Sequence, residues 1–284
     1  MTKEDRESLR DEEKGLLLER LLQEDSEDLA KILEDCGREL KLICVNCGTP
    51  RSAKIRCKKR WCPVCAYYVA VDRVQKYREA VSHFQWPLFV TLTVPNTPDV
   101  EGLIRLKESW GKFRRRKLIR DRVVSGVVGY EVTNKGKGWH PHIHALLDCR
   151  WLSIHIPEPT RRDNREQKEQ KCKMAAEELG RIWSDCCGIE HSSVLARRGD
   201  ADALVEVLKY SCKGSELIAC QDRITPLIRL MQGMRLMTTF GEIRKRIKDE
   251  DLEEAEGDTG CQCENCKMFK TTIPLSAAAF LMRK

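Results

Sequence analysis

Alternation of apolar and polar side chains marks several strands along the chain. Residues 89–94 alternate large apolar residues with threonine and stop at a Pro-Asn-Thr-Pro turn, which is typical of a strand. Apolar residues also dominate 123–133 and 139–147, and the glycine-containing segment 134–138 between them predicts a turn. This order is that of a hairpin. A shorter strand is expected around 192–197.

Helical periodicity accounts for much of the remaining chain. Leucine and isoleucine recur among charges over the first 40 residues and predict an amphipathic helical arm. We expect a solvated arm; contact with a partner or self-association is the alternative. Helices are also expected at 69–83, 101–121, 172–185 and 202–212. Strands and helices are therefore interspersed along the chain.

Changes in composition divide the chain into four parts. We expect an acidic helical arm at 1–40, a cysteine-rich zinc-binding segment at 41–70, the main domain at 71–250 and a cysteine-containing tail at 251–284. The net charge is +7 although the arm is acidic, so the remainder is more basic than the total suggests. Such an excess suits a polyanionic partner such as nucleic acid.

The apolar runs are short and the cysteines are many. No run approaches the roughly 18 apolar residues of a membrane span, and no segment resembles a signal peptide. We therefore expect a cytoplasmic protein without a membrane partner. In that reducing compartment, clustered cysteines more often bind metal than form disulfides.

Histidines concentrate in one short stretch. Four of the six, His140, His142, His144 and His155, lie there. Alternate side chains of a strand share a face, so the first three project together. Two imidazoles two residues apart on a strand supply half of a metal site, and the hairpin places Glu131 on the neighbouring strand.

Fifteen cysteines include two C-x-x-C motifs that flank a basic loop. Paired motifs of this kind give four thiolates access to one zinc ion, and the expected ligands are Cys44, Cys47, Cys62 and Cys65. Cys57 leaves a second set open, in which it joins Cys62, Cys65 and an upstream cysteine. Near the C-terminus, Cys261, Cys263 and Cys266 offer three thiols for a second zinc ion with a remote ligand.

Two basic segments are candidates for DNA contact. The loop between the C-x-x-C motifs carries Arg56, Lys58, Lys59 and Arg60, and the predicted helix 101–121 carries Arg114, Arg115 and Arg116. A metal-stiffened loop with these cations is suited to phosphate contacts, and a solvated loop is the alternative.

The helix expected at 202–212 carries a second chemical group. Glu206, Tyr210 and Lys213 fall on one face at helical spacing. Leu204, Val205 and Leu208 are expected to anchor the other side. Taken alone, this is a common surface pattern. Beside a strand with metal-binding histidines, tyrosine can act as a nucleophile, lysine can stabilise its phenolate and glutamate can act as a base.

The ordered set resembles the HUH endonucleases, and more narrowly the rolling-circle replication initiators of small plasmids. The resemblance rests on the threonine-rich strand, on His142-Ile-His144 and on the Tyr210-x-x-Lys213 helix, with Cys57-x4-Cys62-Pro-x-Cys65 before them. It extends over about residues 44–245. It implies an α+β fold, an elaborated ferredoxin-like arrangement with a central five-stranded antiparallel sheet flanked by helices and an inserted zinc-binding segment.

The resemblance also implies a reaction. His142 and His144 would hold Mg²⁺ or Mn²⁺, with Glu131 as our choice of third ligand and His140 as its competitor. Tyr210 would nick single-stranded origin DNA, become linked to the 5′ end and free a 3′ hydroxyl as a primer. Glu206 would serve the terminating step. The chain has no phosphate-binding loop of the Walker type, so a host helicase and polymerase are expected partners.

Three other functions fit part of the pattern. A single-strand transposase of the same superfamily commonly uses two tyrosines, whereas this helix has only Tyr210. A zinc-ribbon DNA-binding protein without chemistry explains the cysteines and the charge, but not the histidines and the tyrosine. A zinc hydrolase using His140, His142 and His144 predicts cleavage without a covalent adduct.

Overall fold

The computed structural model describes residues 2–44, 47–48, 50–199, 201–208, 214–247 and 272–274. Tyr210 and Lys213 lie outside these ranges, as do Cys261, Cys263 and Cys266. Within them, none of the helices combines the length and the apolar character needed to cross a bilayer.

A five-stranded antiparallel sheet forms the centre of the main domain, as predicted. Its strand order is β6-β3-β5-β4-β7. The strands are β3 (Pro87–Thr93), β4 (Ser125–Asn134), β5 (Trp139–Asp148), β6 (Val194–Arg198) and β7 (Met237–Gly241). The α+β fold class is therefore confirmed. The β4–β5 hairpin lies in the middle of the sheet, and nearly all of its residues are buried.

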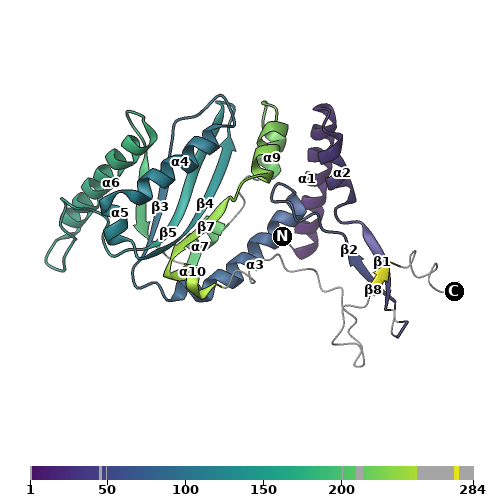
Figure 1. Ribbon diagram of the computed structural model, residues 1–284, viewed down its shortest axis with the longest axis horizontal. Helices are drawn as coiled ribbons and strands as arrows, with labels where there is room; N and C mark the ends of the chain where they lie inside the picture. Colours follow the sequence, from purple (N-terminus) through teal and green to yellow (C-terminus); the bar gives the residue numbers. More distant parts are fainter. Residues whose placement is uncertain are drawn as a thin grey trace.

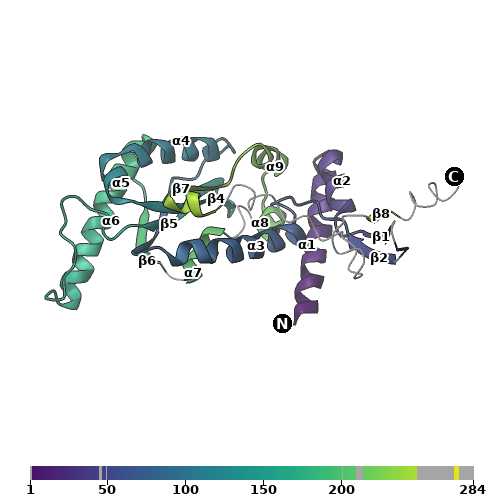
Figure 2. The same cartoon turned by 60° about the horizontal axis from the view of Figure 1, so that its bottom comes forward.

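Helices cover both faces of this sheet (Figures 1 and 2). On one face α4 (Gly102–Arg115), α5 (Lys117–Arg122) and α6 (Arg165–Cys187) enclose the larger core, in which Trp183 is fully buried. On the other face lie α3 (Pro63–Ser82), α7 (Ala201–Leu208) and α10 (Glu242–Arg246). The histidines of β5 project toward this second layer.

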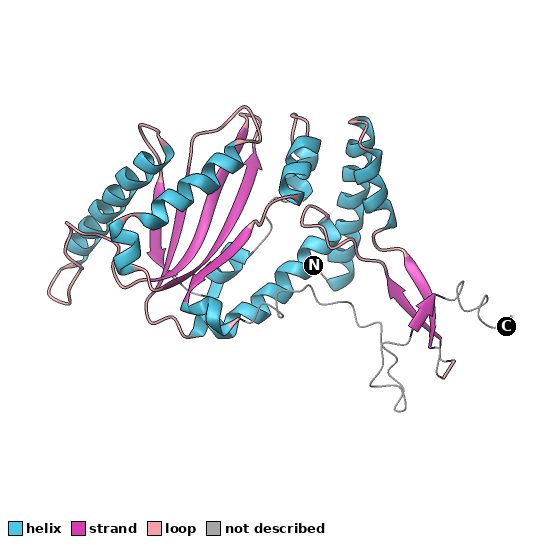
Figure 3. Cartoon of the chain, in the orientation of Figure 1, coloured by secondary structure: helices cyan, strands magenta, loops and turns pink. Residues whose placement is uncertain are grey.

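The cysteine-rich segment contains a second sheet that the sequence analysis did not predict. The strands β1 (Glu39–Cys44) and β2 (Pro50–Lys54) form a hairpin, and β8 (Thr272–Pro274) pairs with the other edge of β1. Figure 3 shows this small sheet apart from the large one. Residues more than 220 positions apart in the sequence thus become neighbours.

The acidic arm is packed rather than solvated, which corrects our expectation. It consists of α1 (Lys3–Gln23) and α2 (Glu27–Asp35). Leu17, Leu21 and Leu33 are 0% exposed and belong to the same core as the large sheet. The apolar stripe predicted the helices correctly. Because the stripe does not specify what covers it, the sequence did not indicate α8 (Gly214–Ala219) or α3 as its partners. The helix α9 (Thr225–Gln232) follows α8.

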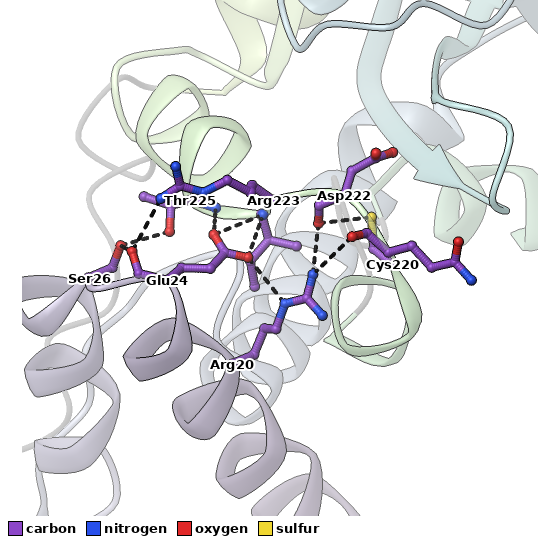
Figure 4. Close-up of polar contacts among 9 residues, drawn as sticks. Arg20, Glu24, Ser26, Cys220, Asp222, Arg223 and Thr225 are labelled. Atoms are coloured by element: carbon purple, nitrogen blue, oxygen red, sulfur yellow. Dashed lines mark hydrogen bonds and ion pairs between the residues drawn. The ribbon is translucent and has the colours of Figure 1, made fainter.

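A network of polar contacts also fixes the arm to the chain before α9 (Figure 4). The buried Glu24 carboxylate accepts backbone N–H bonds from Ile224 and Thr225 at 2.9–3.1 Å. Arg20 donates to that carboxylate at 3.1 Å and to the carbonyl oxygen of Asp222 at 3.0 Å. The carboxylate satisfies amides at the beginning of α9 that have no partner within the helix.

The pKa of Glu24 reflects this environment. Burial raises it, but the hydrogen bonds from the Ile224 and Thr225 backbone outweigh burial and hold the pKa of Glu24 below its usual value. A lowered folded-state pKa means that the ionised carboxylate stabilises the fold above the unfolded-state value of about 4.3. That contribution is lost as the pH falls through the folded-state pKa.

We expect Glu24→Ala to lower the free energy of unfolding by about 1–3 kcal/mol, because it leaves buried amides without acceptors. Denaturant unfolding at pH 7 measures the effect. Below about pH 4 the difference from the unsubstituted protein should shrink, since the carboxylate is protonated there.

Glu19→Ala is the matched control, because Glu19 is an exposed glutamate on the same helix. It should change the free energy by no more than about 0.5 kcal/mol. Equal effects of the two substitutions would contradict the role of the Glu24 contacts.

Candidate metal and nuclease site

The register of the central hairpin brings a carboxylate and two imidazoles together. Glu131 of β4 is the direct cross-strand partner of His142 on β5. One carboxylate oxygen, Oε2, lies 3.0 Å from Nε2 of His142 and 2.9 Å from Nε2 of His144. All three side chains are buried. The structure thus assembles the three residues that the sequence analysis chose as metal ligands.

The outer nitrogens of both rings have partners that orient them. Nδ1 of His142 lies 3.1 Å from the carbonyl oxygen of His140, and Nδ1 of His144 lies 3.2 Å from Oγ1 of Thr91. A carbonyl oxygen only accepts, so Nδ1 of His142 carries the proton. Each ring thus directs Nε2 at the Glu131 carboxylate, where a shared cation would be coordinated. Such partners at Nδ1 are the usual support for metal-binding histidines.

His140 and His155 are placed differently. The His140 ring centre lies 5.3 Å from that of His142, but His140 is not a member of the group of three. Burial lowers the pKa of His140, with smaller contributions from His142 and Lys135. His155 is exposed in the loop after β5, where its backbone N–H donates to Glu178 of α6.

The helix α7 packs directly over the β4–β5 hairpin. Gly129 of β4 permits this approach, because a Cβ at that position would lie 2.2 Å from the carbonyl oxygen of Val207. Val207 and Leu208 are buried against the sheet, whereas Val205, expected to anchor the helix, is 48% exposed. The side chains that anchor it share one face and are Ala203, Leu204, Val207 and Leu208.

Glu206 faces the site from this helix. Its Oε1 lies 3.9 Å from Nε2 of His144. The described part of α7 ends at Leu208, two residues before Tyr210. Of the three residues expected to act together, Glu206, Tyr210 and Lys213, the structure therefore describes only Glu206.

Arg73 is a site residue that the sequence reasoning missed. It projects from α3 and lines the same small cavity as Glu131, His144 and Glu206. In the sequence it is one of many charges on a helix, and no local pattern separates it from the solvated ones. Only the packing of α3 on this face of the sheet reveals its position.

A second group gathers four cysteines at the beginning of α3. The sulfurs of Cys36, Cys57, Cys62 and Cys65 all lie within 4.8 Å of one another, and three are buried. Cys36 lies 3.7 Å from Cys62 and 3.4 Å from Cys65, and Cys57 lies 3.7 Å from Cys65. Tetrahedral coordination with Zn–S bonds of about 2.3 Å separates sulfurs by about 3.8 Å, so the cluster has dimensions that fit a zinc ion.

The crowding of these thiols perturbs their ionisation in opposite directions. Hydrogen bonds from Cys57, then Cys62 and Cys65, lower the pKa of Cys36. The contact with Cys36, followed by those with Cys57 and Cys65 and by burial, raises the pKa of Cys62. A bound dication would let all four sulfurs carry charge together.

This cluster differs from the set that we expected first. Cys57 takes part, and the upstream cysteine is Cys36 at the end of α2, not Cys44 or Cys47. The β1–β2 hairpin is the reason. Its open end brings Cys36 and Cys57 together through the Gly37–Ile55 and Ile55–Arg38 backbone bonds of 2.8 Å. Cys44 and Cys47 lie toward its turn, beyond all five residue pairs of the hairpin; Cys44 is six residues from Arg38, about 20 Å along the strand.

The expected DNA-contacting residues fall into two regions. Arg56, Lys58, Lys59 and Arg60 lie around the cysteine cluster, where the Arg56 guanidinium stacks on Tyr68 at 4.3 Å. Arg114, Arg115 and Arg116 lie at the end of α4 and just after it, on the sheet face opposite to the Glu131 group. There Arg114 stacks on Phe240 at 4.3 Å, and Arg116 donates to Cys186 at 3.3 Å.

Comparison with known proteins identifies a relationship to replication proteins. Residues 51–150 match the family model described as "Replication protein". A protein from Staphylococcus aureus named "Protein rep" is 27% identical over 213 residues, covering 68% of this chain and 85% of that protein. No solved structure matches the chain. The predicted resemblance to replication proteins is thus confirmed, and the matched region contains β3, β4 and β5.

We expect Gly129→Ala to displace α7 and to destabilise the fold by about 1–3 kcal/mol, because the added methyl group overlaps the Val207 carbonyl. Denaturant unfolding measures the loss. Gly111→Ala is the control: Gly111 lies within α4, and its added Cβ meets only the Arg115 side chain at 3.8 Å. That substitution should be neutral or stabilising by up to about 1 kcal/mol. A stable Gly129→Ala protein would show that α7 is not held at this distance.

Proposed function

We propose that this replication protein is a metal-dependent nickase and strand transferase that starts rolling-circle replication at a plasmid origin. The observation that carries the proposal is the convergence of the Glu131, His142 and His144 donors on one point, with Glu206 of the following helix 3.9 Å from that group. The similarity to replication proteins supports origin DNA as the proposed substrate.

The donor set fits a divalent cation such as Mg²⁺ or Mn²⁺. Glu131, His142 and His144 would hold it, and Thr91 and the His140 carbonyl would keep the rings oriented. When bound, the ion supplies a Lewis acid for the scissile phosphate. His140 is proposed as an accessory beside the site rather than a ligand.

Tyr210 is the proposed nucleophile. Its phenolate oxygen forms a bond to the scissile phosphorus, and the bond from phosphorus to the 3′ oxygen breaks. The departing 3′ oxygen takes up a proton and becomes the primer hydroxyl, while the 5′ end stays linked to tyrosine. Lys213, three residues later, would stabilise the phenolate. This role for both residues comes from the sequence pattern beyond α7.

Glu206 is proposed as the base for termination. In that step a second nucleophile, water or a DNA hydroxyl, needs to lose a proton before it attacks phosphorus. The Glu206 side chain is 38% exposed, so it can reach both the site and an entering hydroxyl. The phosphate contacts beside the cysteine cluster would come from Arg56, Lys58, Lys59 and Arg60. Those on the sheet face opposite to the Glu131 group would come from Arg114, Arg115 and Arg116.

We expect the unsubstituted protein to form a covalent adduct with a single-stranded origin oligonucleotide in the presence of Mn²⁺. Tyr210→Phe should abolish the adduct, because the ring stays but the nucleophilic oxygen is lost. Denaturing gel electrophoresis with 5′- and 3′-labelled DNA measures both the adduct and the released strand. His142→Ala should reduce nicking by at least about 100-fold through loss of a metal ligand.

Tyr67→Phe is the matched control, since Tyr67 of α3 lies against the Arg10 guanidinium and does not line the cavity beside Glu131. It should keep the adduct. An adduct that persists in Tyr210→Phe would refute the assignment of the nucleophile, and cleavage without any adduct would favour a zinc hydrolase.

For Glu206→Ala we expect initial nicking within about threefold of normal but defective release of finished circles, because only the terminating nucleophile needs the base. Replication of a reporter plasmid, followed by separation of monomeric circles from concatemers, measures this. Glu216→Ala, on the short helix α8, is the control and should release circles normally. Normal termination by Glu206→Ala would remove its proposed role.

A further inference from the structure

The cavity beside the Glu131 group has an arginine in its wall. Arg73 of α3 lines this cavity, and so do Glu206 of α7 and two members of the group, Glu131 and His144. Among the described residues of the wall, Arg73 is the single lysine or arginine, whereas two residues carry carboxylates. The nicking reaction as set out above gives this arginine no part, although it lies beside the metal donors.

The helical spacing of α3 turns Arg73 toward the sheet. Arg73, Tyr77 and Ala80 follow one another at intervals of four and three residues, so they share a face of the helix. Tyr77 and Ala80 are buried in the core that joins α3 and α7 to the sheet. Burial raises the pKa of Tyr77, and the nearby positive charge of Arg73 opposes that rise. Arg73 itself is half-buried, so packing rather than solvent sets its position.

The charges of the loaded site call for such a cation. A bound divalent ion offsets the two carboxylates of Glu131 and Glu206. The scissile phosphodiester adds a negative charge, and the attacking oxygen brings a second one onto the non-bridging oxygens in the transition state. In a partly buried cavity this charge is stabilised most by a fixed donor that is already in place. Arg73 supplies positive charge at that point.

We propose that Arg73 is a catalytic residue that holds the scissile phosphate. Its guanidinium donates hydrogen bonds to a non-bridging oxygen, and these bonds strengthen as charge develops there. The planar fork of arginine matches phosphate geometry, and its pKa above 12 keeps it protonated. Arg73 transfers no proton, so the bonds formed and broken at phosphorus are those of the proposed nicking reaction, on which this inference rests.

Single-turnover formation of the covalent adduct, with saturating origin oligonucleotide and Mn²⁺, tests the proposal. Arg73→Ala should lower the rate constant by about 100-fold, as expected for loss of a donor to the transition state. Arg73→Lys keeps the charge but loses the fork, and should lower it by about 10-fold. Arg78→Ala is the matched control, because Arg78 is an exposed arginine of the same helix. It should react at the normal rate.

A neutral scissile linkage separates a phosphate contact from a structural role. In a methylphosphonate, a methyl group replaces one non-bridging oxygen and removes the charge that Arg73 offsets. The two stereoisomers are tested separately, because each lacks a different oxygen. With the isomer that lacks the oxygen held by Arg73, Arg73→Ala should lower the rate by less than about threefold relative to the unsubstituted protein. An equal loss on the phosphate and on both neutral isomers would overturn the proposal.

Two further outcomes would also overturn it. One is a normal rate of adduct formation by Arg73→Ala, which would leave the proposed function standing. The other is a loss of DNA affinity with a normal rate at saturation, which would place Arg73 on DNA away from the scissile bond. Absence of the adduct from the unsubstituted protein would instead remove the proposed function together with this role. Arg73→Lys guards against loss of folding in the alanine variant, because its loss on phosphate should also vanish on the neutral isomer.

Discussion

The register between β4 and β5 is the constraint on which the candidate active site depends. It sets Glu131 opposite His142, and two residues further along it sets Gly129 opposite His144. The first pair supplies two of the three candidate metal donors. The second supplies the third, His144, and its glycine gives α7 the space to approach. A slip by one residue would turn Glu131 to the opposite face of the sheet and would remove both features together. Burial of both faces of this hairpin makes such a slip costly.

The strands and the metal group could be predicted because their signals are local. A period of two identifies a strand and also shows that His142 and His144 share a face. A glycine-containing turn then places Glu131 on the neighbouring strand. Each step uses residues within about 15 positions of one another, a range over which hairpin geometry leaves few alternatives.

The cysteine cluster could be predicted only in part, because its fourth ligand comes from another element. Two C-x-x-C motifs suggest a shared ion, but their spacing in the sequence does not reveal that the β1–β2 hairpin separates them in space. The alternation of Glu39 to Cys44 did carry a strand signal. A hairpin that begins with this strand places Cys57 near the end of the arm and Cys44 away from it. The burial of the arm itself rests on long-range packing, which periodicity does not specify.

The two kinds of metal group differ in a way that keeps their ions distinct. Thiolate clusters prefer zinc, whereas a site with one carboxylate and two imidazoles accepts harder ions such as Mg²⁺ and Mn²⁺ as well as zinc. Zinc at low concentration would therefore fill the Cys36 cluster before the Glu131 group. The Cys36 cluster also joins the arm to the beginning of α3, the helix that carries Arg73 into the cavity beside His144. An ion bound by this cluster would stabilise the beginning of α3 and so help to position Arg73 beside the Glu131 group, without sharing a ligand with that group.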